Sequence, residues 1–161
     1  MSNKYRPHLQ VLLEDDANRQ IANGFMLHFA LDTRAIQVLP AAGGWEKVVE
    51  RFKDTHIGAL AKYPERRMLL VVDFDNRTEE RINEIKQEIP SGLSERVFIL
   101  GIRTEPEDLR NQIGKSFENI GQALAEDCAD NKCTLWGHDL LRHNLAELNR
   151  LSSGVKPFLF N

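Results

Sequence analysis

The sequence predicts a three-layer α/β protein with a mostly parallel, four-stranded sheet and helices on both faces. Short apolar runs at residues 8–13, 35–39, 68–72 and 96–100 alternate with stretches of helical spacing. This order favours parallel strands joined by right-handed crossovers. The third run has five apolar residues in a row, which is typical of a strand covered on both faces. We therefore expect a Rossmann-like architecture.

The elements of the first half follow from this pattern. A helix is expected from about residue 16 to 29, because acidic residues begin it and its apolar residues keep helical spacing. After the second strand, the turn Pro-Ala-Ala-Gly-Gly at residues 40–44 leads into a helix headed by Trp45. Pro64 ends that pattern before the third strand.

The second half predicts three further helices. Residues 76–89 form a charged amphipathic stretch that Pro-Ser-Gly ends. A long helix is expected from residue 105, because apolar residues recur at steps of four, four, three and four: Leu109, Ile113, Phe117, Ile120 and Leu124. Residues 125–132 are polar and turn-like, residues 135–151 predict a last helix, and residues 157–160 form an apolar tail suited to an edge strand.

Size and composition indicate a single soluble domain spanning residues 1–161, with a core of about 8–125 and a C-terminal helix and tail at about 133–161. The net charge of −3 gives no field that attracts nucleic acid, so phosphate contacts need a local basic patch or a partner chain. No run approaches the roughly 18 apolar residues of a membrane span. The first residues do not resemble a signal peptide. We expect a cytoplasmic protein without membrane contact.

Acidic residues follow three of the four expected strands: Glu14, then Asp73 and Asp75, then Glu105, Glu107 and Asp108. The carboxyl ends of parallel strands meet at one edge of the sheet, so these residues are expected to lie near one another. Such a cluster of carboxylates favours Mg²⁺ or Mn²⁺. The alternative is that each acid only caps the helix that follows it.

The chain resembles the Toprim fold, the catalytic domain shared by topoisomerases, bacterial primases and the overcoming-lysogenization-defect nucleases. The matching pieces cover about residues 8–125: Val-Leu-Leu-Glu at 11–14, the Gly-containing turn at 38–44, Val-Val-Asp-Phe-Asp at 71–75 and the acidic segment at 99–109. Many members have Gly directly after the Glu, whereas this chain has Asp15.

This resemblance implies roles for the acids. Glu14 would be the general acid or base, and Asp73 and Asp75 would hold Mg²⁺ or Mn²⁺. Candidate ligands for a second metal ion would be Glu105, Glu107 and Asp108. From their places near strand ends, the basic residues that could neutralise a phosphate are Lys47, Arg77 and Arg103, although solvation at the surface is the commoner fate of such residues.

The function expected is metal-dependent phosphodiester hydrolysis of DNA or RNA. Neither Tyr5 nor Tyr63 falls at the proposed edge, so a covalent topoisomerase mechanism is disfavoured. Small size and acidic charge suggest a partner protein such as an ATPase, by analogy with the related nucleases. A non-catalytic Toprim-like interaction subunit stays open as an alternative, and so does a homodimer.

Two other families share parts of the pattern. Leu-Leu-Glu-Asp-Asp at residues 12–16 is similar to the start of a response-regulator receiver, in which Asp73 would accept phosphate. The interval from Asp15 to Asp73 is long for that fold, and no Lys follows a strand in the second half. Residues 71–75 also resemble the opening motif of haloacid-dehalogenase-type phosphatases, which normally lies on the first strand.

Four residues of zinc-ligand type stand at equal spacing: Cys128, Cys133, His138 and His143. Structural zinc sites more often use two to four residues between cysteines. If both histidines share the last helix, their spacing places them about 140° apart around its axis, so they do not converge. We expect two buried or half-buried cysteines and two surface histidines, and the sequence leaves zinc binding open.

Overall fold

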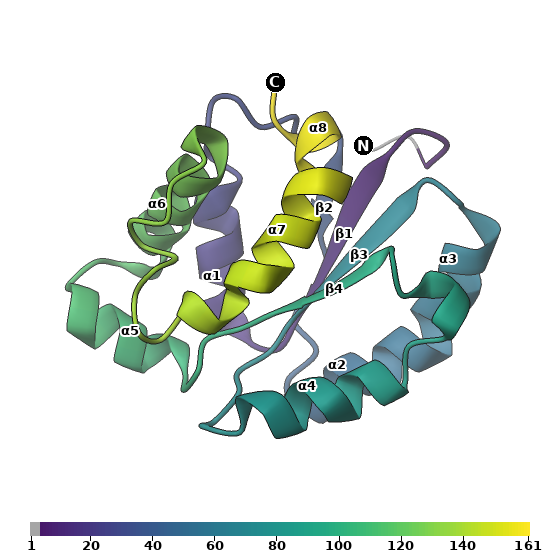
Figure 1. The fold of residues 1–161 in the computed structure, drawn as a ribbon, viewed down its shortest axis with the longest axis horizontal. Coiled ribbons are helices and arrows are strands. Elements are labelled where there is room, and N and C mark those ends of the chain that lie inside the picture. Colours follow the sequence, from purple (N-terminus) through teal and green to yellow (C-terminus); the bar gives the residue numbers. More distant parts are fainter. Residues whose placement is uncertain (1–3) are drawn as a thin grey trace.

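The computed structural model describes residues 4–161 and contains a four-stranded parallel sheet with helices on both faces (Figure 1). The strand order is β2-β1-β3-β4. The strands are β1 His8–Leu13, β2 Ile36–Val38, β3 Arg66–Val71 and β4 Val97–Leu100. The predicted three-layer α/β architecture is confirmed.

The chain reverses its direction across the sheet after β2. It steps outward from β1 to β2, and then crosses back over β1 to form β3 and β4. Right-handed crossovers therefore place α1 on one face and the helices after β2 on the other. The point of reversal lies between β1 and β3, which pair with Leu13 opposite Val71. Open α/β sheets bind their ligands at such a point, outside the carboxyl ends of the strands.

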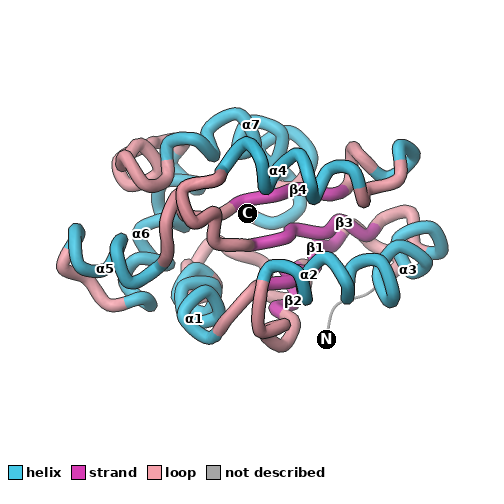
Figure 2. The backbone as a smooth tube through the Cα atoms, turned by 90° about the horizontal axis from the view of Figure 1, so that it is seen from below, coloured by secondary structure: helices cyan, strands magenta, loops and turns pink. Residues whose placement is uncertain are grey.

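Each face of the sheet has its own helices. One face, which we call the filled face, is covered by α2 Trp45–Arg51, a π-helical turn Phe52–His56, α3 Ile57–Lys62 and α4 Thr78–Gln87. Figure 2 shows α2 and α4 lying across the strands on this side. The opposite side, which we call the hollow face, is covered by α1 Asp16–Phe25, α6 Phe117–Asp130, α7 Leu145–Gly154 and α8 Lys156–Leu159.

The long helix expected from residue 105 is two helices. The first, α5, runs from Pro106 to Ile113 and ends at Gly114, whose φ of 73° is left-handed. Ser116 then begins α6, because its side chain accepts a hydrogen bond from the backbone N–H of Asn119 at 3.1 Å. The apolar spacing continues through this turn, so the break was missed. Residues 125–130 belong to α6, and the prediction of a turn from residue 125 was wrong.

The last helix also begins later than predicted. Residues 133–141 form turns, followed by a 3₁₀ turn Arg142–Asn144, and α7 starts only at Leu145. The turns are held by Asp127, whose Oδ2 accepts hydrogen bonds from the backbone N–H groups of Leu135 and Trp136.

Further boundaries differ from those expected. The tail folds as α8 rather than as an edge strand, and only Phe160 forms an isolated antiparallel bridge, to Leu31. Helix α1 ends at Phe25, four residues earlier than predicted. The helix headed by Trp45 continues through the π-helical turn to Lys62.

Candidate functional site

The candidate site lies at the carboxyl edge of the sheet, where β1 and β3 end side by side. Glu14 directly follows β1, and Asp73 comes two residues after β3. The Oε2 atom of Glu14 accepts a hydrogen bond from the backbone N–H of Asp73 at 2.7 Å. Two acidic residues that stand 59 positions apart in the chain are therefore in direct contact at this edge.

Asp73 is buried, with 6% of its surface exposed. Its Oδ1 atom accepts a hydrogen bond of 3.1 Å from the amide Nδ2 of Asn18, on α1. Burial, and then the negative charge of Glu14, raise the pKa of Asp73 to about 8. Burial also raises the pKa of Glu14, although the hydrogen bond from the backbone of Asp73 partly opposes this rise. The surroundings of Glu14 and Asp73 therefore do not fully stabilise the ionised forms of both carboxyl groups.

The loop after Asp73 has an unusual backbone. Asp75 and Asn76 have φ angles of 48° and 62°, which place two consecutive non-glycine residues in the left-handed region. Hydrogen bonds to the loop after β4 hold this conformation: Asp75 N–H donates to Thr104 and Asn76 N–H donates to Arg103. Residues kept in such conformations cost about 1–3 kcal/mol each and cluster at functional sites. The strain therefore supports a functional role for this edge.

A buried arginine organises the same loop. Arg81, on α4, donates from Nη1 to the backbone oxygen of Asp73 and to Oδ2 of Asp75, both at 2.8 Å. Its guanidinium group lies 4.4 Å from the ring centre of Trp45, so the ring and the carboxylate hold it from two sides. Trp45 is thus a packing residue. Arg81 neutralises Asp75 and leaves the side chain of Asp73 without a cation.

Asn18 and Arg81 were not among the site residues predicted from the sequence. Asn18 stands three and seven residues before Ile21 and Phe25, so it lies on the apolar stripe of α1. Arg81 stands four residues before Ile85, on the apolar seam of α4. A polar residue on a buried helical stripe needs a buried partner, and this was the available signal.

The acids after β4 lie at the same edge but farther from the pair. Glu105 occupies the N-cap position of α5 without a side-chain capping bond. The charge of Glu107 is the main cause that raises the pKa of Glu105, and Asp108, Asp75 and Asp15 contribute in the same direction. Glu107 and Asp108 lie in the first turn of α5, where acids suit the helix dipole. Within residues 4–161, no group of three or more His, Cys, Asp or Glu side chains is arranged to hold a metal ion.

The basic residues differ in their freedom to bind phosphate. Arg103 donates from Nη2 to Oδ2 of Asp139 at 2.6 Å and is already paired. Arg77 and Lys47 are exposed. The Lys47 side chain lies near Gly43, whose N–H donates to the backbone oxygen of Glu14 at 2.6 Å. Of these three basic residues, Lys47 is therefore the one that lies beside the turn bonded to Glu14.

The four residues of zinc-ligand type have other partners or exposures. His143 Nε2 contacts the backbone oxygen of Gly101 at 2.7 Å, and His138 Nδ1 accepts from the N–H of Leu140 at 3.1 Å. The two histidines do not share a helix, and both are half-buried rather than on the surface, so these two assumptions were wrong. Cys128 is half-buried, as expected, whereas Cys133 is exposed, so the expectation of burial was wrong for Cys133.

A divalent cation fits the chemistry of the carboxyl pair. Mg²⁺ in phosphate-handling sites is commonly bound by one or two carboxylates, with waters and substrate phosphates as its other ligands. Glu14 and Asp73 offer two hard oxygen ligands, and the raised pKa of Asp73 marks a place where added positive charge is favourable.

None of the helices in the described part of the chain has the length and apolar character needed to cross a membrane. Comparisons with models of protein families, with curated proteins and with solved structures found no match for this chain.

Proposed function

We propose that this chain hydrolyses phosphodiester bonds of nucleic acid with the help of Mg²⁺ or Mn²⁺. The observation that carries the proposal is the buried carboxyl pair, in which Asp73 has a pKa of about 8 beside Glu14. Placing two carboxyl groups together at a partly buried edge makes it costly to ionise both, and strongly perturbed pKa values of this kind cluster at functional sites. The resemblance to the Toprim fold points to the same residues and the same chemistry.

The residues of the edge have distinct roles in this proposal. Glu14 and Asp73 would hold the metal ion, and Asp75 lies close enough to add negative charge to both. When bound, the ion would polarise a phosphoryl oxygen and stabilise the charge that develops during hydrolysis. Glu14 is half-buried and its pKa is raised, so its carboxylate is suited to accept a proton from an attacking water.

Two positioning residues support these roles. Asn18 fixes the carboxyl group of Asp73 through Oδ1. Arg81 fixes the backbone of Asp73 and the carboxylate of Asp75 at the same time. Removing partners that orient metal ligands typically lowers metal affinity or activity by about 10–100-fold.

Binding of the substrate needs more positive charge than this edge supplies. The chain carries a net charge of −3, and the acids after β4 add negative potential beside the pair. Lys47 and Arg77 are the exposed cations that could contact a phosphate here. We therefore include in the proposal a partner protein, such as an ATPase, that brings DNA or RNA to the edge.

We favour hydrolysis over a receiver-like function, in which Asp73 itself would accept a phosphoryl group. A phosphodonor must reach the accepting carboxylate, whereas Asp73 is 6% exposed and its Oδ1 is occupied by Asn18. A carboxylate that binds a metal ion through one oxygen needs less access than a carboxylate that acts as a nucleophile.

Nicking of supercoiled plasmid in Mg²⁺ or Mn²⁺ tests the proposal. We expect Asp73→Ala to lower the rate at least about 100-fold. Asn18→Ala is expected to lower it about tenfold. The matched control is Asp54→Ala, because Asp54 is an exposed acid in the π-helical turn on the filled face.

Metal binding is measured beside activity, as the Mn²⁺-dependent rise of the melting temperature. The proposal predicts a rise in the wild type that Asp73→Ala loses and Asp54→Ala keeps. If Mn²⁺ produces neither nicking nor a rise that depends on Asp73, the metal site does not exist. Uptake of a phosphoryl group at Asp73 from acetyl phosphate, seen by mass spectrometry, would favour the receiver instead.

A further inference from the structure

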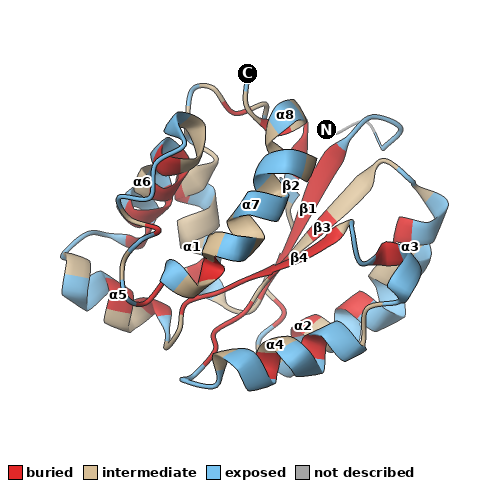
Figure 3. Cartoon of the chain, in the orientation of Figure 1, coloured by how far each residue is buried: buried red, intermediate tan, exposed pale blue. Residues whose placement is uncertain are grey.

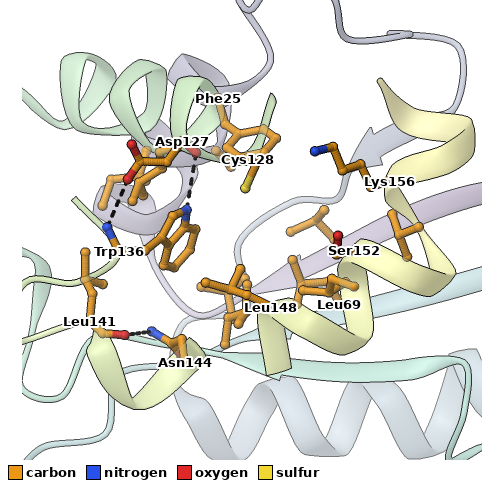
Figure 4. A pocket seen from close by; sticks show the side chains of 18 of the residues that line it. Phe25, Leu69, Asp127, Cys128, Trp136, Leu141, Asn144, Leu148, Ser152 and Lys156 are labelled. Carbon is orange, nitrogen blue, oxygen red and sulfur yellow. Dashed lines mark hydrogen bonds between the residues drawn. The ribbon is translucent and has the colours of Figure 1, made fainter. Parts of the chain in front are cut away.

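A cavity of about 480 Å³ lies within the hollow face, between the sheet, α1, α6 and α7. Figure 4 shows Phe25, Leu69, Leu148 and Trp136 turned toward it from four different parts of the chain. Most of the lining is apolar, and about a quarter of the lining residues are polar or charged. A volume of this size falls within the roughly 300–1,000 Å³ that is usual for small-molecule sites.

The exposure of the surrounding residues shows that side chains do not fill this space. Leu69 and Val71 belong to the central strand β3, yet both are only half-buried, whereas their neighbours Met68 and Leu70 are 0% exposed. No residue of α7 is fully buried, although Leu145 and Leu148 line the cavity. Apolar surface left facing water costs about 25 cal/mol per Å². An apolar ligand would cover this surface.

The cavity lining carries more positively charged than negatively charged side chains. The cations that line it are Lys132 and Lys156, and Figure 4 shows the amine of Lys156 pointing toward the cavity from α8. Lys156 Nζ donates to Oδ1 of Asn131 at 2.6 Å, which holds the amine at the opening. The one carboxylate in the lining is Asp127, whose Oδ2 is engaged by the backbone of Leu135 and Trp136.

We propose that this cavity binds a single-chain amphiphile with an anionic head, of the class of saturated monocarboxylates. The tail lies against Leu69 and Leu148, and the carboxylate is bound by Lys156. A neutral or cationic head would forgo this charge complementarity. Neither Glu14 nor Asp73 lines the cavity, but Asn18, which donates a hydrogen bond to Asp73, does, so the cavity borders the carboxyl pair. The proposal does not depend on phosphodiester hydrolysis.

Calorimetric titration of the full chain with dodecanoate tests the occupant. We expect one dodecanoate per chain, and at least about tenfold weaker binding of dodecyltrimethylammonium, which has the same tail and the opposite charge. Lys156→Gln is expected to weaken dodecanoate binding about tenfold, since a hydrogen bond to a charged group is lost. The matched control is Lys53→Gln, an exposed lysine that pairs with Glu88 on the filled face.

The location is tested by alkylation. In Cys133→Ser, Cys128 is the one remaining cysteine of the chain, and it lines the cavity. Burial raises the pKa of Cys128 to about 11, so its reaction with iodoacetamide is followed at about pH 9, where more thiolate forms. Dodecanoate that occupies most of the sites is expected to slow this reaction at least about fivefold. Leu148→Trp, which puts a larger side chain at the cavity wall, is expected to remove both the heat of binding and this protection.

Several results would overturn the proposal. Absence of binding, equal binding of the anionic and cationic amphiphiles, or binding without protection of Cys128 each contradicts it. Circular dichroism establishes whether Leu148→Trp is folded. If this variant does not fold, Lys156→Gln and the protection of Cys128 still decide the question.

Discussion

The two faces of the sheet are packed in different ways, although they are built from the same strands. On the filled face, Met68, Leu70, Val72 and Phe74 are all 0% exposed. On the hollow face, Leu69 and Val71 of the same segment remain half-buried, and Figure 3 shows β3 partly in the colour of intermediate burial. The difference therefore arises from how the helices lie on the sheet and not from the apolar character of the strand.

A close helix pair accounts for the hollow face. Helices α1 and α6 cross with their backbones in contact, and a Cβ atom added at Gly121 would lie 1.9 Å from the backbone oxygen of Ile21. Helices α1 and α6 pack mainly against each other, whereas α7 contacts β4. No residue of α7 is fully buried by this contact. Both faces have buried apolar clusters, but the cavity lies on the hollow face alone, where it leaves room for a ligand.

The largest effect that distinguishes the faces is expected from two neighbouring leucines. Leu70→Ala leaves a cavity in a close-packed core and is expected to lower the free energy of unfolding by about 3–4 kcal/mol. Leu69→Ala removes a half-buried side chain beside space that already exists, and about 1 kcal/mol is expected. Urea unfolding of both variants measures the difference. Equal losses would mean that the hollow face is as tightly packed as the filled one.

The sequence could predict the strands but not this difference between the faces. Leu69, Leu70, Val71 and Val72 are equally apolar, so their pattern indicates burial on both sides and no more. The width of the cavity depends on where α7 lies, and residues 135–144, which lead into it, were themselves predicted wrongly as helix. A helix position is a tertiary property that local spacing does not encode.

In the candidate site, too, some features could be predicted from the sequence and others could not. Glu14 and Asp73 could be brought together from the sequence, because parallel strands end at one edge and both residues follow apolar runs. The partners that hold them could not, because Asn18 and Arg81 reach the edge from helices on opposite faces. Their positions depend on the crossovers and on the packing of α1 and α4.

A second and smaller effect is expected from Asp73, which continues the hollow-face side of β3 after Val71. Its folded-state pKa of about 8 is above the ordinary value of 3.8, so the folded chain binds more protons between these two values. The folded state therefore loses stability as pH rises from about 4 to 8. Asp73→Asn removes this loss, and its gain over the wild type is expected to reach on the order of 2 kcal/mol at pH 8.

Thermal unfolding in a metal chelator, at pH 4 and pH 8, measures this gain. The two proteins should be nearly equal at pH 4, where both side chains are largely neutral. Asp75→Asn is the control, because Asp75 pairs with Arg81 and its loss should bring no gain at pH 8. A constant difference across this pH range would show that the Asp73 carboxyl is not held in an unfavourable charge state.

The smallest effect is expected when a leucine is replaced by tryptophan on the hollow face, and the same substitution on the filled face serves as the comparison. Leu148→Trp adds volume beside the cavity and is expected to change stability by less than about 1 kcal/mol, with a gain if the ring fits the space. Leu60→Trp adds the same volume at a residue that is 0% exposed on the filled face, and a loss of about 1–3 kcal/mol is expected. Urea unfolding of both variants, without amphiphile, compares them directly. A loss of equal size at Leu148 would mean that the cavity closes in solution, and dodecanoate would then have to reopen it in order to bind.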